Sequence, residues 1–315
     1  MNDVIVGCVG DLLVEIMREN VDDPLDKPGI FLGPYPSGAS GIFIDAISRL
    51  GVKTSFIGTV GDDDFGKLIL TRLEKDGVEI SNIKVSKEYT TGVAFVTYFK
   101  DGSRKFIYHL SKAATGQIYP EDISPKKLSN LNFLHIVGST ISLNENCRES
   151  VKKAIEIVKS SNGKITFDPN LRKELLLNNY TKSLFDSIIA NSYIVFPTEE
   201  ELIELTGEKK LKSAASKLIN MGPEIIAVKQ GGRGSTVFTR GMHFYIPPYE
   251  ENINVIDPTG AGDCYCAGFI SGIIYGMDIK DAAFFANVIG ALSTTKKGPM
   301  EGAPYIKELN KFLRI

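Results

Sequence analysis

Asp257-Pro258-Thr259-Gly260-Ala261-Gly262-Asp263 lies directly before an apolar run at 264–276. Small residues let the backbone turn tightly and leave successive N–H groups accessible, and the apolar run predicts a buried helix. N–H groups at a helix N-terminus bind anions, and an aspartate beside them can accept a proton from a hydroxyl that attacks a phosphoryl group. The stretch therefore suggests a kinase that acts on a small alcohol.

Two other interpretations of the same stretch are less specifically tied to a kinase. It could be a plain strand-to-helix connection, with Asp263 as a first-turn acid favoured by the helix dipole. A dinucleotide G-x-G-x-x-G frame started at Gly260 puts Tyr265 where the third glycine belongs, and the stretch comes late in the chain. The dinucleotide interpretation therefore fails.

A second glycine-rich stretch, 61–68, nearly fits the P-loop frame G-x-x-x-x-G-K-[ST]. Leu68 cannot supply the magnesium-binding hydroxyl, and the three aspartates at 62–64 would repel a polyphosphate. The stretch instead predicts a turn that caps a helix starting near Phe65.

Composition favours one large α/β domain that spans residues 1–315. The chain is 43% hydrophobic and 23% charged, and its net charge of −2 offers no footprint for nucleic acid or an anionic membrane. No apolar run is long enough to span a bilayer, and the N-terminus predicts a strand rather than a signal peptide, so the expected location is cytoplasmic.

The four cysteines and three histidines are too irregularly spaced for a disulfide framework or a zinc site. We expect them to be packing or surface residues.

Short β-branched runs alternate with amphipathic helical patterns, which predicts parallel βαβ construction. The candidate strands are 4–9, 54–58, 133–137, 164–167, 193–196 and 225–228, and the candidate helices include 42–50, 65–76, 149–160 and 211–221. Two regions break this rhythm. Residues 91–109 predict two strands joined at Lys100-Asp101-Gly102-Ser103, and 14–36 form a long connection rich in Pro and Asp. Together they predict a small β layer, about 12–36 and 88–112, that closes over a substrate; an ordinary surface hairpin is an equal alternative.

Several further motifs follow one another in a fixed order along the chain. They are 7–15, Ser37-Gly38-Ala39-Ser40, 60–66, Asp168-Pro169-Asn170-Leu171-Arg172, Pro197-Thr198-Glu199-Glu200-Glu201 and Lys229-Gln230-Gly231-Gly232-Arg233-Gly234. With the stretch at 257–263, they make the chain resemble the ribokinase-like, or PfkB, carbohydrate kinases over essentially its whole length. The resemblance implies a three-layer α/β/α domain with a mostly parallel central sheet and a small β-sheet lid.

The resemblance also implies roles for the residues of the glycine stretch. Asp263 would be the base that activates a sugar hydroxyl, and Gly260, Ala261 and Gly262 would form the anion hole for the transferring phosphoryl group. Preorganised donors suit this step because negative charge builds on the phosphoryl oxygens.

For the cations, Thr198 and Glu201 match an Asn-x-x-Glu element that helps to organise Mg²⁺, although Thr198 departs from the usual Asn. The competing interpretation makes 199–201 the acidic first turn of a helix. Asp257 and the Lys296-Lys297-Gly298 loop resemble a potassium site; a solvated basic helix end is an equal alternative.

ATP would lie against Lys229, Gly231, Gly234 and Asn287. The glycines also fit a hairpin turn between Val228 and Ser235, and Asn287 also fits a polar helix residue.

A sugar-binding site is also expected. Its expected residues are Asp11, Gly38, Ala39, Asp45, Tyr98, Arg104, Tyr108 and Arg172. A turn or cap role competes for Asp11, and Asp45 is included because Ile42 replaces a common sugar-binding Asn one helical turn earlier. Arg172 is expected to meet a carboxylate or the phosphate.

The resulting prediction is an ATP- and Mg²⁺-dependent kinase of a ketohexose (tagatose or fructose) or of 2-keto-3-deoxygluconate. A nucleoside kinase of the same fold and a non-catalytic, sugar-binding regulatory protein are the alternatives. No nucleic acid or membrane partner is expected, and an exposed lid edge would favour a homodimer.

Overall fold

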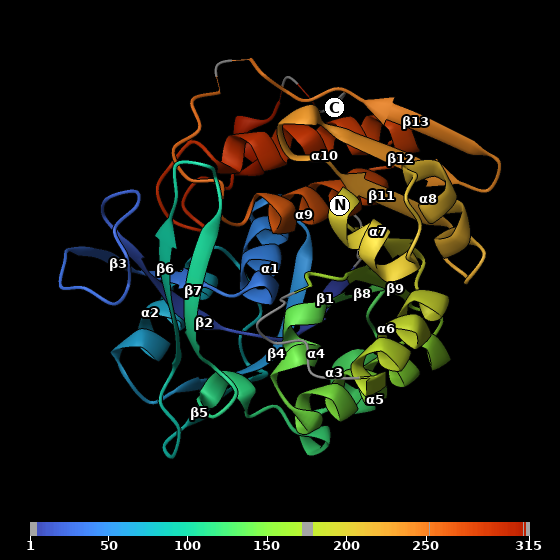
Figure 1. Cartoon of the computed structure of the whole chain (residues 1–315). Coiled ribbons are helices and arrows are strands. Elements are labelled where there is room, and N and C mark those ends of the chain that lie inside the picture. The colour runs from blue at the N-terminus through green and yellow to red at the C-terminus, as the bar shows by residue number, and fades with distance from the viewer. Residues whose placement is uncertain (1–4, 172–178, 252, 311, 313–315) are drawn as a thin grey trace.

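The chain folds around two separate β-sheets (Figure 1). The computed structural model describes residues 5–171, 179–251, 253–310 and 312. The large sheet has nine strands in the order β13-β12-β11-β10-β9-β8-β1-β4-β5, and the small sheet has four in the order β3-β2-β6-β7. Within the described residues, no helix combines the length and apolar character that crossing a membrane requires.

The large sheet is parallel from β5 through to β11, and only β12 and β13 run antiparallel to their neighbours. Its strands are β1 Ile5–Val9, β4 Lys53–Gly61, β5 Ile83–Ser86, β8 Phe133–Val137, β9 Lys164–Asp168, β10 Ile194–Val195, β11 Ile225–Lys229, β12 Ser235–Thr239 and β13 Met242–Ile246. All six predicted strands are present, with ends that move by three residues or fewer. Of the three strands not predicted, β5 and β13 are the edge strands, where side chains are more exposed and the apolar pattern is weaker, and β12 is the buried strand next to β13.

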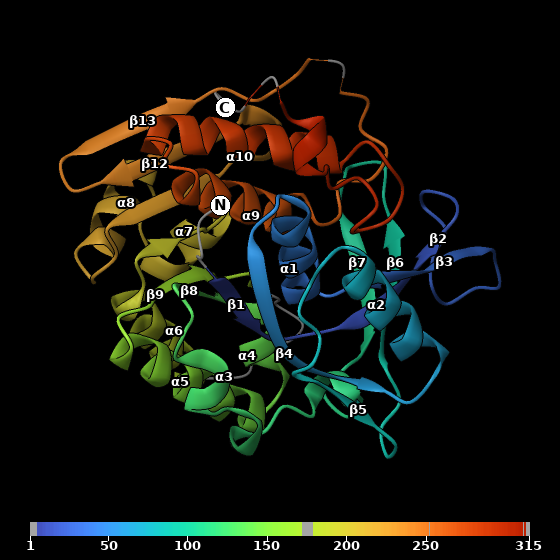
Figure 2. The same ribbon diagram turned by 180° about the vertical axis from the view of Figure 1, so that it is seen from behind.

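Helices cover both faces of the large sheet, as Figures 1 and 2 show from opposite sides. One face packs against α1 Ala39–Arg49, α2 Asp64–Lys75, α9 Ala261–Ile274 and α10 Ile279–Ser293. The other packs against α4 Gly138–Leu143, α5 Glu145–Ser160, α6 Asn179–Asn191, α7 Glu199–Thr206 and α8 Leu211–Ile219, with the short α3 Pro125–Leu128 beside α5. On β11, Ile225 and Ala227 join the first core, whereas Ile226 and Val228 join the second. This alternation follows from the two-residue period of a strand and confirms the predicted three layers.

Two local predictions about helices are confirmed. The amphipathic helix expected at 42–50 is present and buries Ile42, Ala46, Ile47 and Leu50 in the core. At the near-P-loop stretch, the carboxylate of Asp63 accepts a hydrogen bond from the Gly66 N–H at 2.8 Å and caps α2.

The small sheet confirms the predicted β layer. Its strands are β2 Leu13–Arg18, β3 Phe31–Ser37, β6 Gly92–Tyr98 and β7 Arg104–His109. β6 and β7 form the expected antiparallel hairpin, and β6 also pairs in parallel with β2. The sheet stands to one side of the main sheet, next to α2 (Figure 1).

A buried cluster of charged side chains, here called the ion cluster, links α1 and α2 to the segment after α10. Its members are Asp45, Arg49, Arg72, Asp76 and Glu301. Arg49 and Arg72 both donate to Asp76 at 2.7 Å, and Arg72 also pairs with Glu301 at 2.9 Å. Asp45 lies 3.1 Å from Arg49 and is hydrogen-bonded to Asp76. Burial raises the pKa of Asp45 well above its usual value despite the two arginines. Burial acts the same way on Asp76, but hydrogen bonds from Asp45, Tyr305 and Arg49 outweigh it and lower the pKa of Asp76 to about 2.

We therefore expect Asp76→Asn to lower the free energy of unfolding by about 3 kcal/mol at pH 7, because two buried arginines lose a shared counter-charge. The loss should shrink as the pH falls from 3.8 through 2, where wild-type Asp76 itself takes up a proton. Urea unfolding across this pH range measures both effects. Asp45→Asn is the matched control: burial raises the pKa of this carboxyl, so its charge should matter less to the two arginines and the variant should lose less stability than Asp76→Asn. Equal losses for the two variants at pH 7 would contradict the larger role of Asp76 in pairing the arginines.

Candidate active site

A cavity of about 800 Å³ lies between the large sheet and the small sheet. Its floor comes from the carboxyl ends of parallel strands, where ligands bind in open α/β sheets. The main-domain side chains that line it include Asp11 after β1, Ser139 after β8, Asp168 and Asn170 at β9, Thr198 and Glu201 after β10, and Lys229 at β11. The lid contributes Leu13, Glu15, Ser37, Ala94, Arg104, Phe106 and Tyr108, and the stretch 258–263 closes the remaining side.

The N-terminus of α9 is formed by the glycine stretch. Gly260 is its N-cap with φ of 80°, and a Cβ there would lie 2.6 Å from the carbonyl oxygen of Pro299, so this position needs glycine. The first i→i−4 bond runs from the Cys264 N–H to Gly260 at 2.9 Å, which leaves the N–H groups of Gly262 and Asp263 ahead of it. The Ala261 N–H instead donates to Pro258 at 3.3 Å. The turn therefore offers donors for an anion from Gly262 and Asp263 more directly than from Ala261.

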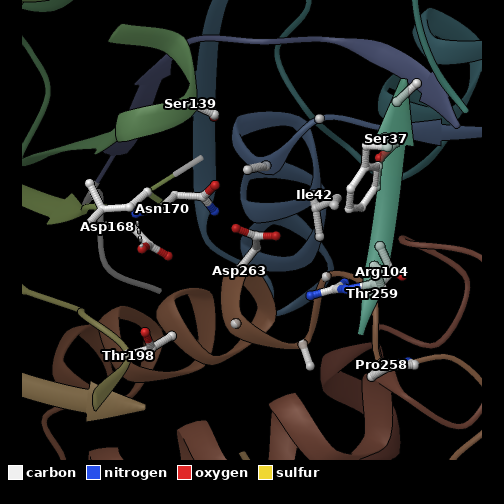
Figure 3. Close-up of a pocket in the computed structure, with 18 of the residues that line it drawn as sticks. Ser37, Ile42, Arg104, Ser139, Asp168, Asn170, Thr198, Pro258, Thr259 and Asp263 are labelled. Atoms are coloured by element: carbon white, nitrogen blue, oxygen red, sulfur yellow. Dashed lines mark hydrogen bonds between the residues drawn. The ribbon is translucent and has the colours of Figure 1, made fainter. Parts of the chain in front are cut away.

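Asp263 lies in this first turn, and its carboxylate points into the large cavity (Figure 3). The residue is 7% exposed. Asp263 lines this cavity, so a hydroxyl bound there would lie near its carboxylate.

A second cavity of about 470 Å³ lies on the other side of the α9 N-terminus. It is lined by Pro248, Tyr249, Ile253, Val255, Asn287, Ala291 and Thr294, among others. It shares Lys229, Gln230, Gly231, Pro258, Ala261 and Gly262 with the large cavity, so the two spaces meet at the glycine turn.

The predicted nucleotide residues lie around this second cavity. Gly231 and Gly234 belong to the turn that joins the antiparallel strands β11 and β12, so the hairpin interpretation is right, and the same turn lines the cavity. Asn287 lines it too, while its amide donates to the carbonyl oxygens of Ile246 at 3.2 Å and Pro247 at 2.7 Å. Lys229 reaches both cavities.

Lys229 forms an ion pair with Asp168, with 2.5 Å between Nζ and Oδ2. The two side chains are 11% and 1% exposed. Burial alone would lower the pKa of Lys229, but the negative charge of Asp168 and Glu201 nearby raises it above its usual value, so the ammonium stays charged. Asp168 was absent from the predicted site residues, although its place directly after a predicted strand was a usable signal.

Thr198 and Glu201 form a capping box at the start of α7. The Thr198 hydroxyl accepts from the Glu201 N–H at 3.2 Å, and Glu201 accepts from the N–H groups of Thr198 and Leu171, both at 2.8 Å. Burial raises the pKa of Glu201, and the charge of Lys229 opposes this. Residues 199–201 are thus the acidic first turn of α7, as the competing interpretation expected, with Thr198 as its N-cap. Thr198 and Glu201 also line the cavity.

Asp168 and Glu201 are the two carboxylates that suit a magnesium site here. Across the described part of the chain, no three His, Cys, Asp or Glu side chains come together as a ready metal cage. Mg²⁺ usually keeps several waters and binds through one or two carboxylates together with substrate phosphates. Asp168 and Glu201, which face the same cavity, fit that mode of binding.

The predicted sugar residues divide into two groups. Asp11, Gly38 and Ala39 line the large cavity, as do Arg104 and Tyr108 on β7. Asp11 also caps α1, because its carboxylate accepts from the Ala39 N–H at 3.1 Å, the Ser40 N–H at 3.3 Å and the Ser40 hydroxyl at 2.7 Å. Asp11 therefore caps α1, as the competing interpretation expected, and also lines the cavity in which a sugar was expected.

The positions of two other residues correct the prediction. Asp45 is fully buried in the ion cluster and lies outside the cavity lining, because Arg49 and Arg72 hold it on the α2 side of α1. Tyr98 does not line the cavity either; its hydroxyl bonds to Asp257 and Thr259. Arg172 lies outside the described residues.

Glu15 is a cavity residue that sequence reasoning missed. It is buried on β2 and accepts a hydrogen bond from the Ser37 hydroxyl at 3.0 Å. The run 13–18 has no polar–apolar alternation, so nothing in the sequence marked Glu15 as facing a substrate.

Asp257 shapes the loop before α9. Its carboxylate accepts from the N–H groups of Thr259 and Gly298, both at 3.0 Å, and from Tyr98 at 3.1 Å. The Lys296-Lys297-Gly298 segment thus lies beside it as expected, whereas potassium binding there stays a prediction.

The fold is that of the ribokinase-like sugar kinases. An E. coli protein provisionally called ribokinase II, solved alone and with ATP and Mg²⁺, superposes with a TM-score of 0.92 at 37% identity over 99% of both chains. Fructokinase from Vibrio cholerae O395, solved with fructose, ADP and calcium, gives a TM-score of 0.84 at 26% identity over 99% of both chains.

The sequence profile of the pfkB family carbohydrate kinases matches residues 35–305, and the chain belongs to this family. Probable fructokinase-3 of Arabidopsis thaliana is 30% identical over 97% of this chain and 90% of its own length. A fructokinase of Klebsiella pneumoniae is 28% identical over 98% of this chain and 99% of its own length. The resemblance inferred from the ordered motifs is therefore confirmed.

Proposed function

We propose that the protein transfers the γ-phosphoryl group of ATP to a hydroxyl of a ketohexose, with fructose as the first candidate. The observation that carries this proposal is the meeting of two cavities at the α9 N-terminus, with Asp263 facing only the larger one. Relatives named fructokinase, which match nearly the whole chain, support the choice of sugar.

In this reaction the sugar lies in the large cavity under the lid, and the nucleotide lies in the second cavity. Asp263 accepts the proton of the attacking hydroxyl. The first-turn N–H groups of α9 and the Lys229 ammonium, which lies where the cavities join, face the phosphoryl group and stabilise the charge that develops on its oxygens. Mg²⁺, when bound, neutralises phosphate charge, and Asp168 and Glu201 would hold it through water.

Two carboxylates suit a neutral sugar with many hydroxyl groups. Asp11 and Glu15 are both buried acids at the cavity wall and can accept hydrogen bonds from sugar hydroxyls. Arg104, which lines the cavity from the lid, favours a second candidate, the sugar acid 2-keto-3-deoxygluconate, because a guanidinium binds a carboxylate in bidentate fashion.

We expect fructose to show the highest kcat/KM in a coupled ADP-release assay with ATP and Mg²⁺ against tagatose, 2-keto-3-deoxygluconate, ribose, glucose and adenosine. Arg104→Met distinguishes the two leading substrates. It should lower kcat/KM for a sugar acid by at least about 10-fold, since a charged hydrogen bond is lost, and change that for fructose much less. A preference for adenosine would overturn the ketohexose proposal, and tight sugar binding without any turnover would favour a regulatory protein.

The assignment of ATP as the phosphoryl donor, and of Mg²⁺ as the ion that binds with it, is part of the same proposal. A potassium ion at Asp257, the cytoplasmic location and a homodimer through the lid stay predictions.

A further inference from the structure

The lid touches the loops around the phosphoryl site through two tyrosines. The Tyr98 hydroxyl, at the end of β6, donates to the Asp257 carboxylate at 3.1 Å and is also hydrogen-bonded to the Thr259 hydroxyl. Tyr35, on β3, packs so closely on Gly298 that a Cβ there would lie 2.7 Å from its ring. Strands from the lid therefore reach both loops that frame the start of α9.

These loops support the glycine turn directly. Thr259 immediately precedes Gly260, the N-cap of α9. The Asp257 carboxylate also holds the Gly298 N–H at 3.0 Å, and the carbonyl oxygen of the next residue, Pro299, packs on Gly260. A shift of Asp257 or Thr259 would therefore move the N–H groups that face the phosphoryl group.

The strand that carries Tyr98 lies between the two lid strands that face the sugar cavity. β6 pairs with β2, which contributes Glu15, and with β7, which contributes Arg104 and Tyr108. A sugar that binds these side chains would hold all three strands in place, because they share backbone hydrogen bonds.

We propose that Tyr98 is a positioning residue that couples closure of the lid over the sugar to the geometry of the glycine turn. This inference rests on the proposed function, since it places the sugar under the lid. Burial raises the pKa of Tyr98, so its hydroxyl keeps the proton that it donates to Asp257. The coupling is reciprocal by thermodynamic necessity: sugar strengthens nucleotide binding by the same factor as nucleotide strengthens sugar binding.

The test is Tyr98→Phe, which removes the hydroxyl and keeps the ring that packs near Lys297. The affinity for Mg²⁺·AMP-PNP is measured by calorimetry with and without saturating fructose, or the sugar with the highest kcat/KM in the panel above. We expect the sugar to tighten AMP-PNP binding about 5- to 150-fold in the wild type and less than about 3-fold in Tyr98→Phe. Affinity for AMP-PNP alone should change less than about twofold, and kcat should fall about 10-fold, as expected for one lost hydrogen bond to a charged group.

A second measurement does not depend on which sugar binds. Without ligands, hydrogen exchange of the β6 and β7 amides should be faster in Tyr98→Phe than in the wild type, because the lid loses an attachment to the main domain. Tyr89→Phe is the matched control, since this half-buried tyrosine precedes β6 and lines neither cavity. It should behave like the wild type in both experiments.

Unchanged coupling and unchanged exchange in Tyr98→Phe would overturn the proposal. So would an equal weakening of sugar and nucleotide binding with no change in their coupling, which would indicate a general structural role. Failure of the proposed function would look different: the wild type would bind or phosphorylate no sugar, while the exchange experiment would still report on the lid contact.

Discussion

Asp263→Asn is expected to lower kcat for sugar phosphorylation by about 10²- to 10⁴-fold, the range for loss of a general base. Asn has nearly the same shape as Asp but cannot accept the hydroxyl proton. The carboxylate lies on the sugar side of the α9 N-terminus, so the nucleotide cavity should keep its shape. We therefore expect the Kd for Mg²⁺·AMP-PNP to change less than about twofold.

Steady-state kinetics and AMP-PNP calorimetry measure these two effects. Asp278→Asn is a suitable control, because Asp278 caps the neighbouring helix α10 by accepting from the Asp281 N–H at 2.9 Å, outside both cavities. It should cost about 1 kcal/mol of stability or less and leave kcat unchanged. If Asp263→Asn kept more than a tenth of wild-type kcat, Asp263 would not be the base.

Gly260→Ala should reduce kcat by about 10²- to 10³-fold, the cost of losing one preorganised donor in an oxyanion site. Alanine at φ of 80° is strained by about 1–2 kcal/mol, and its Cβ would lie 2.6 Å from the backbone oxygen of Pro299. Since that oxygen belongs to the backbone, the glycine turn itself must shift. The N–H groups of Gly262 and Asp263 would then move away from the phosphoryl group.

Gly276 at the other end of α9 provides the matched control. It has φ of 79°, yet a Cβ there would meet nothing within 4 Å. Gly276→Ala should therefore show the same backbone strain in thermal unfolding and wild-type kcat. An equal loss of kcat in both variants would mean that strain, rather than the position of the glycine turn, limits activity.

Much of the fold could be predicted because its signals are local. Alternating β-branched and amphipathic runs placed the parallel strands, and Asp63 was recognised as part of a helix-capping turn. Edge strands such as β5 and β13 were missed, because a strand with one exposed side needs no continuous apolar run.

The site was predicted in part for a similar reason. The glycine turn and Asp263 are contiguous in sequence, so the motif itself shows that they lie together. The ion pair of Asp168 with Lys229 joins residues 61 positions apart, and only the carboxyl ends of β9 and β11, the two strands that flank β10, bring them near each other. Asp45 shows the opposite case: helical spacing put it on the substrate side, but the arginines of α1 and α2 decide its surroundings.

By itself, the sequence determined the family, the α/β class and the turn that faces the phosphoryl group, because each depends on short patterns of residue type and spacing. Tertiary structure alone decided which side chains share a cavity: it brought Glu15 to the sugar side, kept Asp45 in the core and set Tyr98 against the loop at Asp257. The physical reason is that packing between sheets and buried charge pairing act between residues far apart in the chain, where no local pattern records them.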